Sequence, residues 1–505
     1  MNKTAQSPND FDVIATTEGV KLQGEDLAVH EIKKRSISGV FAYILRAILL
    51  NVISGITQLI ITGALSPTQY GVYGLVITVT SFFTIISDIG LGASLVQKKE
   101  FPTTKELRTV FTVQQCLAWI VFALIGVTAL TLSRFGRLDR EGIYLALAFG
   151  IAFPIVSLKT IPSILLEREL QFHKLIIPAI VEAFVLNGTL AYFALHGAGI
   201  RSFTYAVLAQ SIIGVVTMFF IRRWDMGLQF SKKEFFALMS IGTRFQLNDM
   251  LAKAKDDLFY LTVALFIPSS QFGYITWAKL WSRQPYSFTV DNVSAITFPA
   301  FSRLQHDYTS LGRAIEKTIF FITFIAFPMF AGLVVMFIPF LHLFPKQLKW
   351  EPAIVSLGLY SFALAFASFS TPLVNTLNAI GKISESLKMM VFWTTAQWVL
   401  FPLFFWKFGY TAVPLIDASL AFTSLYVVVL VKKYVKFNFF DQVWRQTLAS
   451  LTMMIALYEF IPLWQRSLPL FILGIVAGGA MYSVLMITTG FEKIKGEVVS
   501  LLAKR

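Results

Sequence analysis

Long apolar runs recur along almost the whole chain, and they limit the possible folds more than any other feature. They begin near residue 36 and continue to about residue 489 of the 505. In a helix, about 20 such residues cross the ~30 Å hydrocarbon core of a bilayer. Only 14% of the residues are charged, compared with about 25% in an ordinary soluble domain. The sequence therefore predicts an all-α, polytopic membrane protein.

Glycines, prolines and charge clusters divide these runs into about 14 transmembrane helices, of which the second is expected near residues 71–97 and the fourth near residues 143–166. With the N-terminus inside, the cytoplasmic segments hold about 26 Lys and Arg and the external loops about 8. Because Lys and Arg stay in cytoplasmic loops, this bias predicts that both termini are cytoplasmic. The expected segments are a polar tail (1–35), an N-lobe of six helices (36–222), a linker (223–234), a C-lobe of six helices (235–432), a loop (433–446), two further helices (447–490) and a C-terminal tail (491–505).

Two external turns have similar sequences at a constant separation of 202 positions. The first reads Leu65 to Tyr73 (LSPTQYGVY) and the second Ile267 to Ile275 (IPSSQFGYI), so that Gln, an aromatic residue and Gly coincide. Chance is the alternative explanation, since Gly and Pro favour any hairpin. We interpret the match as a parallel repeat of two pseudo-symmetric six-helix lobes, an arrangement typical of transporters whose halves move about a central site.

Several chemistries find no support in the sequence. The single cysteine, Cys116, allows no disulfide within one chain. The five histidines have no metal-ligand spacing, and no phosphate-binding P-loop or nucleophile elbow occurs. The net charge of +14 is distributed as membrane topology requires and does not indicate nucleic-acid binding. We therefore expect no catalytic residues, metal or cofactor.

Three groups of short motifs resemble one family of transporters. They are the L-S-P-x-Q-Y-G-x-Y turn, the stretches Ser87 to Gly92 (SDIGLG) and Leu95 to Lys99 (LVQKK), and Leu166 to Phe172 (LERELQF). Phe298 to Leu304 (FPAFSRL) and Asn378 to Lys382 (NAIGK) continue the likeness. Together with the helix layout, they resemble the polysaccharide transporter (Wzx-type oligosaccharide flippase) family of the multidrug/oligosaccharidyl-lipid/polysaccharide superfamily.

The resemblance implies that the protein is a flippase of the bacterial inner membrane, not an enzyme. Its substrate would be an undecaprenyl-pyrophosphate-linked repeat unit, moved to the outer leaflet by alternating access for capsule, exopolysaccharide or O-antigen synthesis. Its partners would be this substrate, membrane lipids, and the polymerase and export machinery. The alternatives are a drug or small-molecule exporter of the same superfamily, and a membrane polysaccharide polymerase or ligase.

Basic residues at membrane depth are the candidates for holding a pyrophosphate. An ionisable side chain inside the bilayer is costly unless it faces water or a partner, and is therefore a functional candidate. Ammonium and guanidinium groups form charge-assisted hydrogen bonds to phosphate oxygens. The helical rise of ~1.5 Å per residue places four such groups near mid-depth, and a fifth near the cytoplasmic end. These predicted substrate-binding residues are Lys253, Lys255, Lys279, Arg283 and Arg46.

Acidic residues and one proline are candidates for coupling or gating. Asp257 and Lys253 are four positions apart on one helix, so an ion pair is an equally good explanation of both. Asp88 and its repeat counterpart Asp291 could close the inner side or couple transport to an ion. Glu182 could line the groove or pair locally. Pro285, two residues after Arg283, could hinge its helix.

Overall fold

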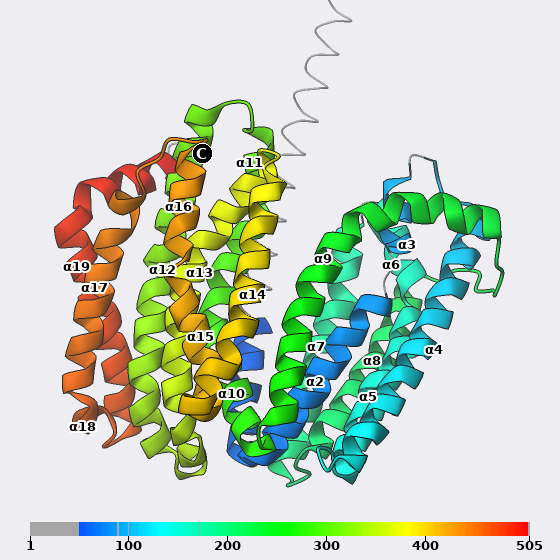
Figure 1. Ribbon diagram of the computed structural model, residues 1–505, viewed down its shortest axis with the longest axis horizontal. Helices are drawn as coiled ribbons and strands as arrows, with labels where there is room; N and C mark the ends of the chain where they lie inside the picture. Colours follow the sequence, from blue (N-terminus) through cyan, green and yellow to red (C-terminus); the bar gives the residue numbers. More distant parts are fainter. Residues whose placement is uncertain (1–49, 88–89, 99, 170, 503–505) are drawn as a thin grey trace, which may run out of the picture. The chain divides into compact units, whose positions relative to one another are not determined.

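The computed structural model describes residues 50–502 except 88–89, 99 and 170, without the side chains of 97, 240–255 and 490–502. All described secondary structure is helical (Figure 1). The helices are Leu50–Ala64, α2 (Pro67–Ser87), α3 (Leu91–Gln97), α4 (Thr104–Arg134), α5 (Arg140–Ser157), α6 (Thr160–Arg168), α7 (Phe172–Leu195), α8 (Arg201–Ile221), α9 (Lys232–Phe266), α10 (Ser269–Tyr286), α11 (Asn292–Arg303), α12 (Tyr308–Leu343), α13 (Ile354–Ala379), α14 (Ile383–Phe408), α15 (Ala412–Ala421), α16 (Ser424–Lys432), α17 (Phe439–Glu459), α18 (Ile461–Trp464) and α19 (Leu468–Leu502). The described residues from Gly55 onward form one compact unit.

The helical membrane fold predicted from the sequence is confirmed. Nine of the described helical stretches are long and apolar enough to cross a membrane. Every predicted span is mainly helical in the part that the structure describes.

Some predicted spans are interrupted. The expected span 143–166 is divided into α5 and α6 at Leu158 and Lys159, whose amides bond the carbonyls three residues back. Pro162 explains this break, because it has no N–H to continue the α-helical ladder. Likewise, α2 and α3 replace the expected span 71–97, and Gly90 before α3 has a left-handed φ of 83°.

The two similar turns pack directly against each other through α2 and α10. A Cβ atom on Gly71 would lie 1.7 Å from the carbonyl oxygen of Ser269, and one on Gly273 would lie 2.0 Å from that of Pro67. Only glycine permits so close a backbone approach. Pro67 corresponds to Ser269, and Gly71 to Gly273, at the same separation of 202 positions. The contact is therefore reciprocal, as expected for two elements related by a local twofold axis.

Near this contact, a side chain from the first half of the chain caps a helix from the second half. Arg137 lies between α4 and α5. Its guanidinium donates to the carbonyl oxygens of Ile267, at 3.0 Å, and Leu265. These carbonyls end α9, where helical backbone has no intrahelical donor left. A cation at this negative end of the helix is also favoured by the helix dipole.

The converse contact lies between α12 and α13, where three side chains cap the helix Leu50–Ala64. The donors belong to a 3-10 segment, Pro345–Ala353. Gln347, Lys349 and Trp350 donate to the carbonyls of Leu59, Gly63 and Thr62 at 2.9, 2.8 and 2.8 Å, respectively. Each half of the chain thus caps the end of the other half's first helix.

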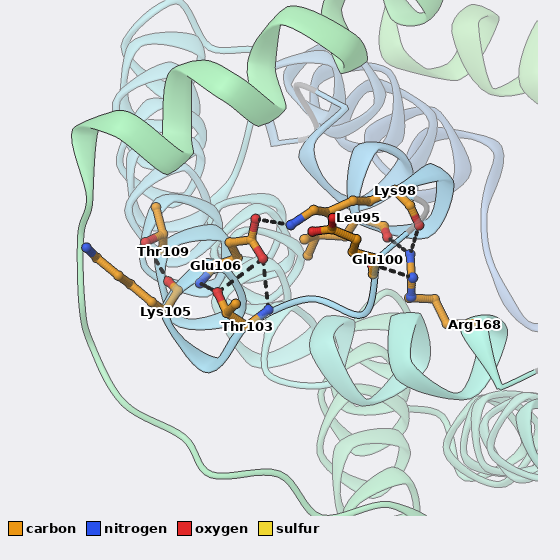
Figure 2. Close-up of polar contacts among 8 residues, drawn as sticks. All are labelled: Leu95, Lys98, Glu100, Thr103, Lys105, Glu106, Thr109 and Arg168. Carbon is orange, nitrogen blue, oxygen red and sulfur yellow. Dashed lines mark hydrogen bonds and ion pairs between the residues drawn. The ribbon is translucent and has the colours of Figure 1, made fainter.

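At the other end of the first-half helices, two of the family-like motifs form one joint (Figure 2). The Arg168 guanidinium, at the end of α6, donates to several backbone carbonyls in and just after the last turn of α3. These belong to Leu95, Val96, Lys98 and Glu100. Lys98 in turn pairs with Glu106 at 2.6 Å, and this hydrogen bond raises the pKa of Lys98. The LERELQF and LVQKK motifs therefore fix α3 between α4 and α6.

We predict that Gly71→Ala lowers the free energy of unfolding by about 1–3 kcal/mol, because its methyl group forces apart two packed backbones. Gly273→Ala should do the same, since it faces the same contact from the other side. Gly188→Ala is the matched control, because its added Cβ meets nothing within 4 Å. Denaturant unfolding in detergent measures all three, and equal stability of the three variants would contradict the prediction.

Candidate functional site

A cavity of about 410 Å³ lies among helices of the second half of the chain. It is contributed by α9, α10, α13, α14, α15 and α16. Its polar and charged lining comprises Tyr260, Lys279, Ser282, Arg283, Tyr360, Ser370, Thr371, Asn375, Trp393, Gln397, Asp417 and Ser424. Its size lies within the range of ligand-binding sites, about 300–1,000 Å³.

Lys279 lies in this cavity beside an aromatic and acidic wall. Its side chain is exposed, although it lies ten residues, or about 15 Å, along α10 from Ser269. Its Nζ atom lies 3.3 Å from the ring centroid of Tyr260, a cation–π contact. The Tyr260 hydroxyl is 3.5 Å from an oxygen of Asp417, whose other oxygen accepts a 3.0 Å hydrogen bond from Gln397.

Arg283 follows Lys279 by one helical turn and lines the same cavity. Its side chain is 57% exposed, and its guanidinium lies 3.1 Å from the carboxylate of Asp291, whose side chain is 45% exposed. Pro285 interrupts the α-helical ladder just beyond Arg283, and a π-helical segment, Ser287–Asp291, follows it. The wide turn of this segment places Asp291 where it accepts a hydrogen bond from Arg283, eight residues earlier in the chain. Such π segments occur frequently at functional sites.

Two other predicted residues, Asp257 and Glu182, are not part of this cavity's lining. Asp257 accepts a 2.7 Å hydrogen bond from Ser81 of α2, so it joins α9 to the first half of the chain. Glu182 of α7 pairs with Lys159, at the break between α5 and α6. This pair is largely buried, and the Glu182 side chain packs over Gly214 of α8. Of the two possibilities for Glu182, the structure has local pairing.

Four predicted residues are not placed by the structure. Arg46 and Asp88 lie outside the described residues. Lys253 and Lys255 belong to α9, but their side chains lie outside the described part. Their roles stay predictions.

Sequence reasoning missed the acidic and aromatic side of the cavity. Asp417 is the single charged residue in the apolar stretch Ala412–Ala421 of α15, and a carboxylate at membrane depth is a functional candidate by default. That signal could have identified it. Tyr260, Tyr360 and Gln397 could not have been chosen from the sequence, because their importance comes from side chains on other helices.

The cavity has cations that could bind an anion, together with nearby carboxylates that partly neutralise them. Two exposed cations, Lys279 and Arg283, lie on one face of α10, and each is close to a carboxylate or an aromatic ring. Amide and hydroxyl groups supply further hydrogen bonds. Among the described residues, no group of three or more His, Cys, Asp or Glu could hold a metal ion.

The fold and this cavity define the protein as a multi-pass helical membrane transporter. The structure is similar to one titled "Lipid II flippase MurJ, inward closed conformation", with a TM-score of 0.72 and 15% identity, over 89% of this chain and 99% of the other. A family model described as "Polysaccharide biosynthesis protein" matches residues 60–355. The chain therefore belongs to this family, which confirms the family resemblance predicted from its motifs.

Two curated relatives agree with this assignment. A protein named "Uncharacterized membrane protein in cps region" from Klebsiella pneumoniae is 23% identical over 93% of this chain and 98% of its own length. The succinoglycan biosynthesis transport protein ExoT of Rhizobium meliloti is 22% identical over 65% of this chain and 66% of its own length. Family and fold are those of transporters rather than enzymes.

We predict that Glu182→Ala destabilises the protein by about 3 kcal/mol, because it leaves the Lys159 ammonium unpaired in a largely buried place. The double variant Lys159→Met/Glu182→Leu removes both charges and should recover most of the loss. Denaturant unfolding measures the stability of each. If the double variant is as unstable as Glu182→Ala, the unpaired charge is not the cause.

Proposed function

We propose that the protein is a flippase for an undecaprenyl-pyrophosphate-linked oligosaccharide repeat unit. It carries this substrate from the cytoplasmic to the outer leaflet of the bacterial inner membrane, for capsule, exopolysaccharide or O-antigen synthesis. Both chain termini lie in the cytoplasm. Membership of the polysaccharide biosynthesis family supports the substrate class, and the excess of Lys and Arg in alternate loops supports the orientation.

One observation carries the proposal: Lys279 and Arg283 are exposed cations in a cavity at membrane depth. Both are far enough along α10 from Ser269 to lie well inside the hydrocarbon core. Exposed charges there imply a water-filled space. A pyrophosphate is the matching ligand, because it offers several oxygens to the ammonium and the forked guanidinium.

A second pocket, which is apolar, supports the proposal that the substrate carries a lipid tail. It has a volume of about 470 Å³ and lies among α12, α13, α16 and α17. Its aromatic lining consists of Phe327, Phe330, Phe362, Phe366, Phe369 and Phe439. A polyprenyl chain gains free energy in proportion to the apolar area that it removes from water, so a pocket of this composition suits part of such a chain.

Asp417 supports a second candidate function, the export of an organic cation. A carboxylate beside Tyr260, Tyr360 and Trp393 is the combination that binds cationic ligands. The neighbouring Lys279 opposes such a ligand through charge repulsion. We therefore prefer the anionic, lipid-linked substrate, and transport assays with both substrate types separate the two.

We predict that Lys279→Ala and Arg283→Ala each reduce translocation at least about tenfold, because one charge-assisted hydrogen bond contributes about 1.5–3 kcal/mol. Proteoliposomes with a labelled lipid-linked oligosaccharide measure the rate. The control is Lys388→Ala, which removes a 72% exposed cation paired with Glu385 at one end of α14.

Unchanged rates in both cavity variants would refute the cationic site. Loss of organic-cation transport in Asp417→Asn, with no oligosaccharide transport by the wild type, would instead establish the second candidate.

Alternating access requires that the external side of the protein opens and closes. The helix-end hydrogen bonds made by Arg137 and Lys349, each to the opposite half of the chain, lie at that side. We predict that Arg137→Gln/Lys349→Gln favours the outward-open state, because it removes both cationic caps between the halves. A cysteine at Thr371, inside the cavity, in a Cys116→Ser background, should then react faster with an impermeant thiol reagent added outside. Equal labelling rates with and without the caps would contradict this closure.

A further inference from the structure

A further crevice, distinct from the cationic cavity and from the apolar pocket, lies on the first half of the chain. It has a volume of about 660 Å³ and is lined by residues of α4, α5 and α8. Its lining is Phe122, Glu141, Tyr144, Leu147, Ala148, Ile151, Arg201, Thr204, Tyr205 and Leu208. Neither the transport cycle nor the family membership assigns it a ligand.

Polar groups occupy one end of this crevice and apolar groups the other. Glu141 and Arg201 stand at the starts of α5 and α8, where these helices enter the membrane. Ile151 lies ten residues further along α5, or about 15 Å deeper, which is half of the hydrocarbon thickness. The crevice therefore extends from the membrane surface to about mid-bilayer, the depth that one leaflet occupies.

Two tyrosines place the polar end at the membrane–water interface. Tyr144 is 56% exposed and Tyr205 41% exposed. Tyrosine is enriched at this level, because its ring is apolar and its hydroxyl needs water or a headgroup. An occupant with a polar head and an apolar tail fits this distribution, whereas a sugar or an entirely apolar molecule fits only one end.

The charges at the mouth specify the headgroup. Arg201 donates two hydrogen bonds to Glu141, Nε at 2.6 Å and Nη2 at 2.5 Å. Three of the five guanidinium N–H groups remain, and both carboxylate oxygens keep free lone pairs. The Arg201 side chain is 57% exposed and the Glu141 side chain 25% exposed, so a ligand can reach both. The mouth thus presents one positive and one negative group side by side.

We propose that this crevice binds a zwitterionic phospholipid of the leaflet that the charge distribution predicts to be external. The lipid phosphate contacts Arg201, its ammonium contacts Glu141, and part of one acyl chain lies along Leu147, Ile151 and Leu208. An anionic lipid, including a polyprenyl pyrophosphate, is disfavoured because Glu141 repels it. The site does not depend on which substrate the cationic cavity transports.

Native mass spectrometry of the purified full chain tests the proposal, with phosphatidylethanolamine and phosphatidylglycerol of identical acyl chains as probes. The wild type should retain phosphatidylethanolamine about tenfold better, the factor expected for one charge-assisted hydrogen bond. Glu141→Gln removes the negative group and leaves Arg201 free, so it should reverse the preference towards phosphatidylglycerol. Glu141→Gln/Arg201→Gln should lose the discrimination.

Glu385→Gln is the matched control, because Glu385 is 24% exposed and also pairs with a cation, Lys388, at 2.9 Å. It should keep the wild-type preference. Unfolding midpoints in detergent without lipid verify that each variant is folded. The proposal is overturned if the wild type shows no preference, or if Glu141→Gln retains phosphatidylethanolamine as the wild type does.

Discussion

The backbone contact between α2 and α10 is the constraint on which the rest of the arrangement depends. Gly71 and Gly273 allow each helix to lie against the first turn of the other, so that backbone touches backbone at this contact between the two halves of the chain. Gly74 extends this face, since a Cβ there would lie 2.3 Å from the Thr276 hydroxyl oxygen. Small residues commonly form such close helix contacts in membranes, where apolar side chains gain nothing by leaving lipid for each other. The direction of α10 is thereby set, and with it the positions of Lys279 and Arg283.

Unpaired backbone groups at helix ends explain why the halves also exchange caps. A carbonyl without a donor costs several kcal/mol in hydrocarbon, and each helix ends with four of them. Arg137, Lys349 and Trp350 supply donors from the opposite half of the chain. The same hydrogen bonds therefore hold the two halves together at this end and pair the helix-end carbonyls. Water can replace these donors when the end opens, because the carbonyls then face solvent. The caps therefore hold the closed state without making the open state prohibitively costly.

Most of the fold follows from local sequence properties, whereas the site does not. Apolar runs and charged loops indicate the helices, and the Gly-containing turns at a separation of 202 indicate a repeat. That these two turns contact each other is visible only in the structure. Lys279 and Arg283 were found because a cation in an apolar run is conspicuous, and one helical turn separates them. The partner of Glu182 could not be predicted, since Lys159 becomes available only through the break at Pro162. The partners of Asp417 could not be predicted either, because its contacts with Gln397 and Tyr260 join α14 and α15 to the distant α9.

The carboxylates beside the two cations bear on how a transported anion leaves the cavity as well as how it enters. An isolated pair of cations at membrane depth would hold a pyrophosphate too tightly for turnover, because Coulomb interactions are strong where water is scarce. Asp291 already contacts Arg283, and Asp417 lies across Tyr260 from Lys279. In the proposed transport cycle, a phosphate would therefore displace or share each contact, and the carboxylates would reclaim the cations on its release. Because Asp291 ends the π-helical segment that follows Pro285, a change in this segment would alter the pairing of Arg283. The ion pair of Arg283 with Asp291 thus links the strength of anion binding to the geometry of the π-helical segment.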